Sequence, residues 1–280
     1  MFVWLASYPK SGNTLVRSML AAYFFSNDGI YNFDLIKNIK QFPNITLFEN
    51  LGVNIKNEKE IIKNYIKVQQ TFNKKNSVQF LKTHSYLFNI DNYAFTDLNN
   101  SLGVIYIVRD PRNVITSIKN HYNKDTFSKA LEFIKNEKQL LGDLKDSKLE
   151  TDLPTVISSW KNHYNSWKKI KTNYLLIKYE NLLNKPEEEF FKITDFLEKL
   201  SNFKFKKDDI IKSIKATSFD NLKNQERKKG FKEASKDKFG NPIKFFNLGP
   251  ENNWYKLLDK KIINSIEESF KNEMIDLGYL

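Results

Sequence analysis

The sequence predicts an α/β fold: a single domain with a central parallel sheet flanked by helices. Short apolar runs rich in branched residues recur along the chain, each too short for a helix, as is typical of buried parallel strands. Segments with helical periodicity alternate with them, which is the pattern of crossover connections. With 280 residues, 40% hydrophobic and 14% aromatic, the chain can bury one large core. No internal repeat or linker indicates a second domain, so we expect one domain over residues 1–280.

The expected strands are the four apolar runs Phe2 to Ala6, Val78 to Leu81, Gly103 to Val108 and Tyr174 to Ile177. Valine, isoleucine and aromatic residues dominate these runs, and such residues fit a pleated, buried surface. Because the runs are apolar almost throughout, without alternation, we expect both faces of the sheet to be covered.

The expected helices follow the strands and one another along the chain. They are Thr14 to Phe25, Glu58 to Phe72, Asn113 to Tyr122, Ser128 to Leu141, Thr155 to Ile170 and Pro186 to Leu200. Asp110-Pro111 and Asn184 to Glu189 place a capping residue, a proline or acids where a helix begins. Lys223 to Phe246 is rich in lysine, contains glycine and proline, and shows little periodicity. We expect it to be a long mobile loop that can act as a lid.

The composition excludes several classes of protein. There is no cysteine, so disulfides and thiol chemistry are excluded, and with three histidines a histidine-rich metal site is not expected. The net charge of +12 and the pI near 9.4 favour anionic partners, although most lysines also fit a solvated surface. No apolar run approaches the roughly 20 residues of a membrane-spanning helix, and the N-terminus lacks a leader pattern. We therefore expect a cytoplasmic protein without a transmembrane segment.

Polar motifs follow each predicted strand. They are Tyr8 to Thr14, Lys82-Thr83-His84, Arg109 to Arg112 and Tyr179-Glu180-Asn181. Loops at the carboxyl ends of parallel strands meet at one edge of a sheet, where α/β folds bind ligands. The first motif joins a strand to a helix and places a lysine, hydroxyls and a glycine at an anion-binding helix N-terminus. Since its lysine precedes Ser-Gly, it is not a Walker A loop, and no Gly-x-Gly-x-x-Gly is present.

Taken singly, these motifs also fit structural roles. Lys82 and Arg109 can be surface charges, His84 a hydrogen-bonded structural residue, and Asp110 a helix cap. Taken together, in their order along the chain, the motifs indicate a family. The segments Tyr8-Pro-Lys-Ser-Gly-Asn-Thr14, Lys82-Thr83-His84 and Ile107-Val-Arg-Asp-Pro-Arg-Asn-Val-Ile-Thr-Ser117 resemble the signature loops of sulfotransferases that use 3′-phosphoadenosine 5′-phosphosulfate (PAPS). Leu176 to Leu182 and Thr217-Ser-Phe219 continue the resemblance.

The resemblance implies a three-layer sandwich of the P-loop kinase type and a bipartite nucleotide site. The 5′-phosphate side comprises Lys10, Ser11, Gly12, Asn13 and Thr14. The 3′-phosphate side comprises Arg109 and Ser117, and Tyr179, Thr217 and Phe219 surround the adenine and ribose. Arginine offers phosphate a planar fork, whereas lysine is a compact movable charge. For Phe219, core packing is an equally good interpretation.

The resemblance also implies the catalytic residues. His84 matches the base that takes the proton of an acceptor hydroxyl or amine, and Lys10 matches the residue that stabilises the bridging oxygen. Lys82 contacts the acceptor or the transition state in this interpretation. We interpret His121 and His163 as structural. PAPS is a cosubstrate, no metal is implied, and the acceptor is a small molecule, lipid or glycan and not a nucleic acid.

The chain departs from the family near its C-terminus. The family has Arg-Lys-Gly before a Gly-Asp-Trp-Lys-like segment, and here the sequence is Phe245 to Lys256, without the arginine. Gly249 and Trp254 keep the outline of the motif. The 3′-phosphate contact is therefore expected from the backbone of Gly249 or from Arg227, Lys228 or Lys244. The aromatic residue that often follows the first loop is Leu15 here, and no dimer-forming pattern indicates an oligomeric state.

Two other functions remain open from the sequence. A kinase on a related scaffold would need a Walker A loop and a metal-holding carboxylate, and neither is evident. A non-enzymatic polyanion-binding protein is supported by charge alone.

Overall fold

The centre of the molecule is a parallel sheet, seen in a computed structural model that describes residues 1–27, 29–74, 76–142 and 153–280. Within this part of the chain the sheet has five strands. Their order across the sheet is β2 (Lys40–Gln41), β3 (Gln79–Thr83), β1 (Phe2–Ser7), β6 (Ser101–Val108) and β9 (Asn173–Lys178). Parallel neighbours need crossover connections, which the helices provide. The predicted α/β fold is confirmed.

β1 lies in the middle of the sheet and separates two hydrophobic cores. All six of its residues are buried. Because side chains alternate along a strand, Phe2 and Trp4 point into one core, and Val3 and Leu5 point into the other. The uninterrupted apolar run at the start of the sequence is explained by this double coverage.

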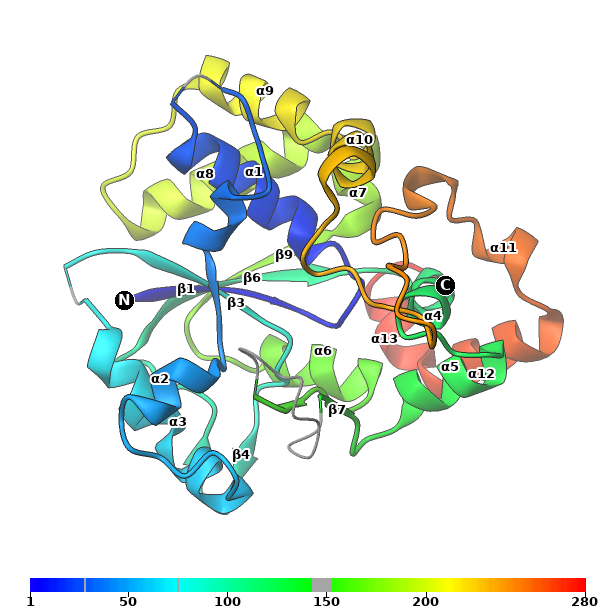
Figure 1. Cartoon of the computed structure of the whole chain (residues 1–280), viewed down its shortest axis with the longest axis horizontal. Helices are drawn as coiled ribbons and strands as arrows, with labels where there is room; N and C mark the ends of the chain where they lie inside the picture. The colour runs from blue at the N-terminus through cyan, green and yellow to red at the C-terminus, as the bar shows by residue number, and fades with distance from the viewer. Residues whose placement is uncertain (28, 75, 143–152) are drawn as a thin grey trace.

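One face of the sheet is covered by helices that pack on Val3 and Leu5 (Figure 1). These are α1 (Asn13–Phe25), α7 (Tyr179–Asn184), α8 (Pro186–Leu200), α9 (Lys207–Ala216) and α10 (Phe219–Lys229). The short helix η1 (Leu35–Asn38) lies against α1. α8 has the predicted bounds, with Pro186 in its first turn and Glu187, Glu188 and Glu189 beside it.

The other face carries α2 (Ile45–Glu49), α3 (Glu58–Phe72) and α6 (Trp160–Lys168) (Figure 1). Two short antiparallel pairs accompany them, β4 (Asn89–Ile90) with β5 (Tyr93–Ala94) and β7 (Leu140–Leu141) with β8 (Thr155–Val156). Helices grouped around the carboxyl end of β6 complete the molecule. They are α4 (Pro111–His121), α5 (Phe127–Lys135), α11 (Trp254–Leu257), α12 (Lys260–Ser269) and α13 (Lys271–Asp276), with η2 (Gly249–Glu251) before α11.

Three predicted segments differ from the structure. The helix expected over 128–141 ends at Lys135, and the helix expected over 155–170 begins at Trp160. At the facing ends of these two segments, Leu140–Leu141 pairs with Thr155–Val156 as β7 and β8, a contact between distant segments that periodicity does not reveal. The first seven residues of the loop expected over 223–246 belong to α10. We call the remainder, residues 230–246, the lid segment.

Candidate functional site

The loop between β1 and α1 turns through two residues with positive φ. Lys10 has φ 66° and Gly12 has φ 103°. Gly12 tolerates this conformation, and a Cβ atom at this position would also overlap the ring of Tyr179. Gly12 is the N-cap of α1 and supplies no side-chain cap. The N–H groups of Asn13 and Thr14 can therefore serve an anion, as the sequence predicts, whereas the N–H of Leu15 donates to the carbonyl oxygen of Gly12 at 3.0 Å.

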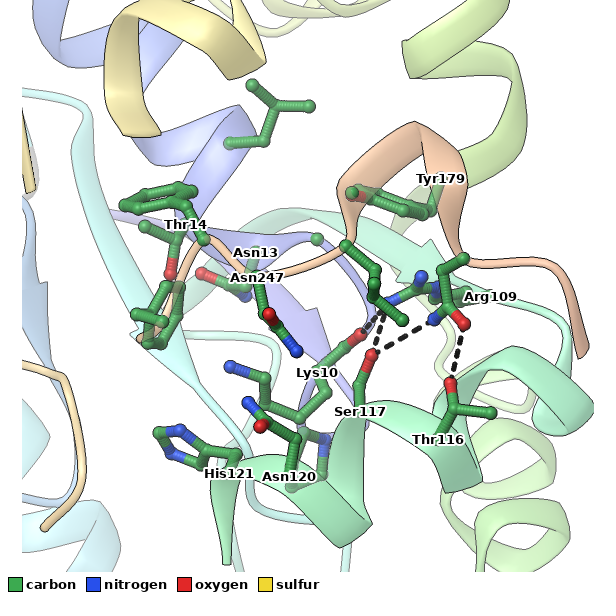
Figure 2. Close-up of a pocket in the computed structure, with 18 of the residues that line it drawn as sticks. Lys10, Asn13, Thr14, Arg109, Thr116, Ser117, Asn120, His121, Tyr179 and Asn247 are labelled. Carbon is green, nitrogen blue, oxygen red and sulfur yellow. Dashed lines mark hydrogen bonds between the residues drawn. The ribbon is translucent and has the colours of Figure 1, made fainter. Parts of the chain in front are cut away.

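Arg109, at the end of β6, joins this loop to α4 (Figure 2). Its Nη1 donates to the carbonyl oxygen of Lys10 and to Oγ of Ser117, both at 3.0 Å. Its guanidinium carbon lies 4.4 Å from the centre of the Tyr179 ring. Nδ2 of Asn252 also donates to Ser117, at 3.3 Å. The arrangement brings together four residues that the sequence assigns to the nucleotide, namely Lys10, Arg109, Ser117 and Tyr179.

The Lys10 ammonium lies 3.5 Å from the centre of the Phe245 ring. Burial lowers the pKa of Lys10 to about 7, and the charge of Arg109 acts in the same direction. An anion bound beside the ammonium would favour its charged form. Lys10 is therefore suited to gain charge as a negative group arrives.

His84 is oriented by a hydrogen bond at Nδ1, and its side chain lines the cavity. Its Nδ1 lies 2.8 Å from the carbonyl oxygen of Ser7, an acceptor, so this nitrogen carries the proton. Nε2 is then the basic nitrogen. Burial, followed by the charge of Lys82, lowers the pKa of His84 well below its usual value. The neutral imidazole is therefore the form present near pH 7.

His163 holds the backbone of His84 through a hydrogen bond. Its Nε2 donates to the carbonyl oxygen of His84 at 3.1 Å, and its Nδ1 accepts from the Tyr106 hydroxyl at 2.8 Å. The side chain is fully buried. This confirms the structural interpretation of His163.

A charged cluster lies next to the loop and includes one carboxylate, Glu233 of the lid segment. Its Oε1 accepts from Nη1 of Arg17 at 2.6 Å. Its Oε2 lies 3.5 Å from Nζ of Lys82 and 3.4 Å from the hydroxyl oxygen of Thr14. Arg17 also donates to the carbonyl oxygen of Ile39 at 3.1 Å. The cluster thus ties the lid segment to α1 and β3.

These groups surround one cavity at the carboxyl edge of the sheet (Figure 2). The predicted site residues on its wall are Lys10, Gly12, Asn13, Thr14, His84, Arg109, Ser117, Tyr179, Phe219 and Gly249. They come from four strand-end loops and from the C-terminal third of the chain. Residues assigned to binding and to catalysis therefore share a single hollow.

Some predicted residues have other surroundings. Thr217 is fully buried, and its hydroxyl donates to the carbonyl oxygen of Ser213 at 2.7 Å. The Asn13 amide, although on the wall, donates to the carbonyl oxygen of Leu5 at 2.8 Å. Ser11 and Lys82 lie beside the wall, Lys82 in its pair with Glu233. Thr217 is thus engaged with the backbone of α9 and does not reach the cavity.

Several residues of the wall are not among the predicted site residues; they include His121, Glu233, Phe245, Asn247 and Asn252. The structural interpretation of His121 is incomplete, because its side chain faces the cavity near Lys10 and Asn120 (Figure 2). Burial, followed by the charge of Lys10, lowers its pKa to about 3. Its helical spacing of four residues from Ser117 was the available signal. Asn252 gave no signal, because its bonds to Thr116 and Asn113 form only in the folded chain.

The structure also locates the candidates for the missing arginine. Gly249 lies on the cavity wall, where it packs on the Phe219 ring. Arg227 and Lys228 line a separate surface hollow with Gly29 and Tyr31. Lys244 is exposed. Of the four candidates, Gly249 is therefore the one positioned to meet a ligand in the cavity.

The residues around the cavity fit an anionic nucleotide. Ser11 Oγ and Arg109 Nε are buried donors without a hydrogen-bond partner in the described part of the chain. A phosphate oxygen would satisfy such donors. The Tyr179 and Phe219 rings offer flat surfaces for a base.

The described residues contain no cluster of histidine and acidic side chains suited to a metal ion. None of the helices formed by these residues is long and apolar enough to cross a membrane.

Comparison with known proteins identifies relatives of the whole chain. A family model described as "Sulfotransferase domain" matches residues 2–278. Mouse sulfotransferase SULT7A1 complexed with PAP aligns with a TM-score of 0.59 at 19% identity, over 98% of this chain and 84% of that one. Retinol dehydratase in complex with retinol and PAP aligns with a TM-score of 0.62 at 16% identity, over 98% and 81%. These two structures share the fold. A search of curated protein sequences finds no match.

Proposed function

The chain belongs to the sulfotransferase family, and from that premise we propose that it transfers a sulfuryl group from PAPS to a hydroxyl or amine. The observation that carries the proposal is the single cavity shared by the first loop, Arg109 and His84. A site for this reaction must hold two phosphates, stabilise a leaving oxygen and accept a proton. Each task has a residue in that cavity.

The donor would bind along the loops at the carboxyl edge of the sheet. We assign its 5′ end to Ser11, Gly12, Asn13 and Thr14, where α1 begins without a side-chain cap. We assign its 3′-phosphate to two residues already joined by a hydrogen bond, Arg109 and Ser117, with the backbone of Gly249 completing the site. Tyr179 and Phe219 would flank the base. Thr217 would support α9 and Phe219 without touching the nucleotide.

His84 would act as the general base. Its Nδ1 is fixed by Ser7, so Nε2 can accept the proton of the acceptor as a new bond to sulfur forms. Lys10 would donate to the bridging oxygen as the bond from sulfur to the 5′-phosphate breaks, releasing adenosine 3′,5′-bisphosphate (PAP). Since burial lowers the pKa of Lys10 to about 7, the negative charge developing there would raise the charged fraction of Lys10. We assign Lys82 to the same region, paired with Glu233.

The acceptor would be a small molecule, lipid or glycan. One structural relative binds retinol, a small molecule with a hydroxyl group. Next to Lys10, this cavity offers the Phe245 ring together with Asn120, His121 and Asn247. We propose further that residues 1–280 form one catalytic domain whose lid segment moves with the ligands, and we expect it to act in the cytoplasm.

Thermal stabilisation tests the donor before any acceptor is known. PAP should raise the melting temperature in proportion to its binding, because a ligand that binds the folded state stabilises it by mass action. ATP with magnesium and NAD should have much smaller effects at equal concentration. A larger shift with magnesium-ATP than with PAP would contradict the proposal and favour a kinase. Equal binding to generic DNA and PAP that weakens steeply with salt would instead indicate a polyanion-binding protein.

A further inference from the structure

The lid segment contributes one carboxylate to the cavity, Glu233, and none of the steps assigned above uses it. Glu233 and His84 line the same cavity. Its side chain is 29% exposed, whereas those of its partners Arg17 and Lys82 are 5% and 7% exposed. A carboxylate from an irregular segment therefore pairs with two buried cations from regular elements, α1 and β3.

The two cations require this anion. Breaking a buried ion pair leaves the remaining charge without compensation, which is strongly unfavourable. Although burial opposes it, the charges of Lys82 and Arg17 lower the pKa of Glu233 well below its usual value. Glu233 is thus ionised at any pH near neutrality, while its Oε2 also accepts from the Thr14 hydroxyl.

We propose that Glu233 is a positioning residue of the transfer reaction: it holds Lys82 beside His84 and stabilises the imidazolium ion that His84 becomes on taking the acceptor's proton. This inference rests on the proposed function. Lys82 lies two residues before His84 and its charge already lowers the pKa of His84, so the new positive charge forms under the repulsion of an existing one. A carboxylate bonded to Lys82 offsets that repulsion.

The charges around His84 support this role. Burial and Lys82 lower the pKa of His84, and the bond to Ser7 and the charge of Glu233 oppose them. Several titratable groups influence the pKa values of His84 and of its neighbours Lys10, His121 and Glu233. They are Lys82 from β3, Lys10 from the first loop, Arg17 from α1, His121 from α4, His163 from α6, Glu226 from α10 and Glu233. Of these groups, Glu233 is the carboxylate whose charge raises the pKa of His84.

A coupling between lid closure and proton transfer follows. Arg17 belongs to α1, Lys82 to β3 and His84 to the residues directly after β3, whereas Glu233 belongs to the lid segment, for which movement with the ligands is proposed above. The base is fully compensated when that segment lies against α1 and β3. Proton transfer is then fastest after the lid has covered the site, when water is excluded from the donor.

The same segment provides a matched control, Asp237. Its carboxylate accepts from the backbone N–H groups of Phe239 and Asn241, at 2.8 and 2.9 Å, within an exposed turn. Asp237→Asn removes an acid from the lid segment without touching the cavity. Glu233→Gln removes the charge at the proposed position and keeps the shape of the side chain.

The experiment measures three quantities in the wild type, Glu233→Gln and Asp237→Asn. The first is PAP affinity by calorimetry, and the second is the release of PAP from PAPS, with water as acceptor, as a function of pH. The third is the titration of His84 by NMR of isotopically labelled histidine, which is practical because the chain has three histidines. His84→Gln assigns the signal.

Loss of the carboxylate should make protonation of His84 less favourable. In Glu233→Gln, the pKa of His84 should fall by about one unit, which is the size of shift that the loss of one nearby negative charge produces. The acid limb of the pH–rate profile of PAP release should move to lower pH with the pKa of His84. The plateau of that profile should fall about tenfold, because the base is weaker. PAP affinity should stay within about twofold. Asp237→Asn should match the wild type in all three measurements.

Two results would overturn the role of Glu233. One is an unchanged His84 titration in Glu233→Gln, which would reduce the residue to a lid anchor. The other is tighter PAP binding without a shift of the acid limb, which would mean that Glu233 competes with the donor. Failure of the wild type to bind PAP or to cleave PAPS would count against the proposed function instead. The NMR titration of the free protein still decides the charge contact in that case.

Discussion

Lys10 shows how the surroundings of a single residue adapt it to a charged ligand. Its backbone is in the left-handed region, at φ 66°, and its carbonyl oxygen is held by Arg109. A residue other than glycine pays for this conformation unless its surroundings compensate. The bond from Arg109 therefore joins the two halves of the proposed nucleotide site through the backbone of Lys10.

The pH dependence of PAP binding tests the state of Lys10. Because its pKa in the free protein is lowered to about 7, Lys10 is charged below pH 7 and increasingly neutral above it. A bound phosphate raises that pKa, so affinity should be highest near pH 7 and fall as the pH rises through the pKa of the complex. We expect a decrease of up to about tenfold per pH unit above pH 7, measured by calorimetry. Phosphate protonation, with a pKa near 6, stays outside this window.

Lys10→Met provides the comparison. The variant should bind PAP more weakly at pH 7 and show a flat profile between pH 7 and 9. An equally steep profile in the variant would assign the proton to another group.

Individual site residues differ in how far the sequence reveals them. Lys10, His84 and Arg109 stand directly after predicted strands, so the rule for parallel sheets places them at one edge. Glu233 lies in an aperiodic segment. Its partners Arg17 and Lys82 are both more than 150 residues away in sequence. Local patterns carry no information about such pairs.

At the scale of elements, the segment around η2, which lacks the arginine of the family motif, packs closely on Phe219. Gly249 has φ 53°, and a Cβ atom there would overlap the Phe219 ring. Asn252 anchors the segment to α4 through Thr116 at 2.8 Å. The backbone of Gly249 thus lies against a ring that the nucleotide is expected to use.

Gly249→Ala tests this packing. The added methyl group must displace Phe219, so PAP affinity should fall by on the order of tenfold, measured by calorimetry, while the fold remains intact. Gly240→Ala is the matched control, because Gly240 has φ 88° but no atom within 4 Å of the added Cβ. Equal losses in both variants would attribute the effect to backbone strain alone.

The ends of some helices are predictable from the local sequence, whereas others depend on contacts between distant segments. The start of α8 is encoded by Pro186 and three glutamates, and the predicted and observed bounds agree. α5 and α6 are shorter than predicted because residues at their facing ends form β7 and β8. α10 is capped at its start by Ser218, whose hydroxyl accepts from the N–H of Asn221, and the helix continues to Lys229, seven residues into the segment predicted as a loop.

At the scale of the molecule, the parallel sheet explains why one cavity gathers residues from the whole chain. β1, β3, β6 and β9 run in the same direction, so the loops that follow them meet at one edge. The lid segment crosses this edge where β1 ends (Figure 1). The fold class was predictable because buried strands and the helices between them leave strong local patterns in the sequence, whereas the strand order is seen only in the structure. The acceptor is not, since its pocket depends on how the lid segment and α4 pack.

The most direct test of the proposed mechanism separates binding from chemistry in one variant. His84→Ala should bind PAP with an affinity within about twofold of the wild type, because the ring is held by Ser7 and is not assigned to the nucleotide. The rate of PAP release from PAPS should fall by about 10²-fold or more, the usual contribution of a general base. Retained binding with lost turnover would support His84 as the base, and unchanged turnover in His84→Ala would contradict it.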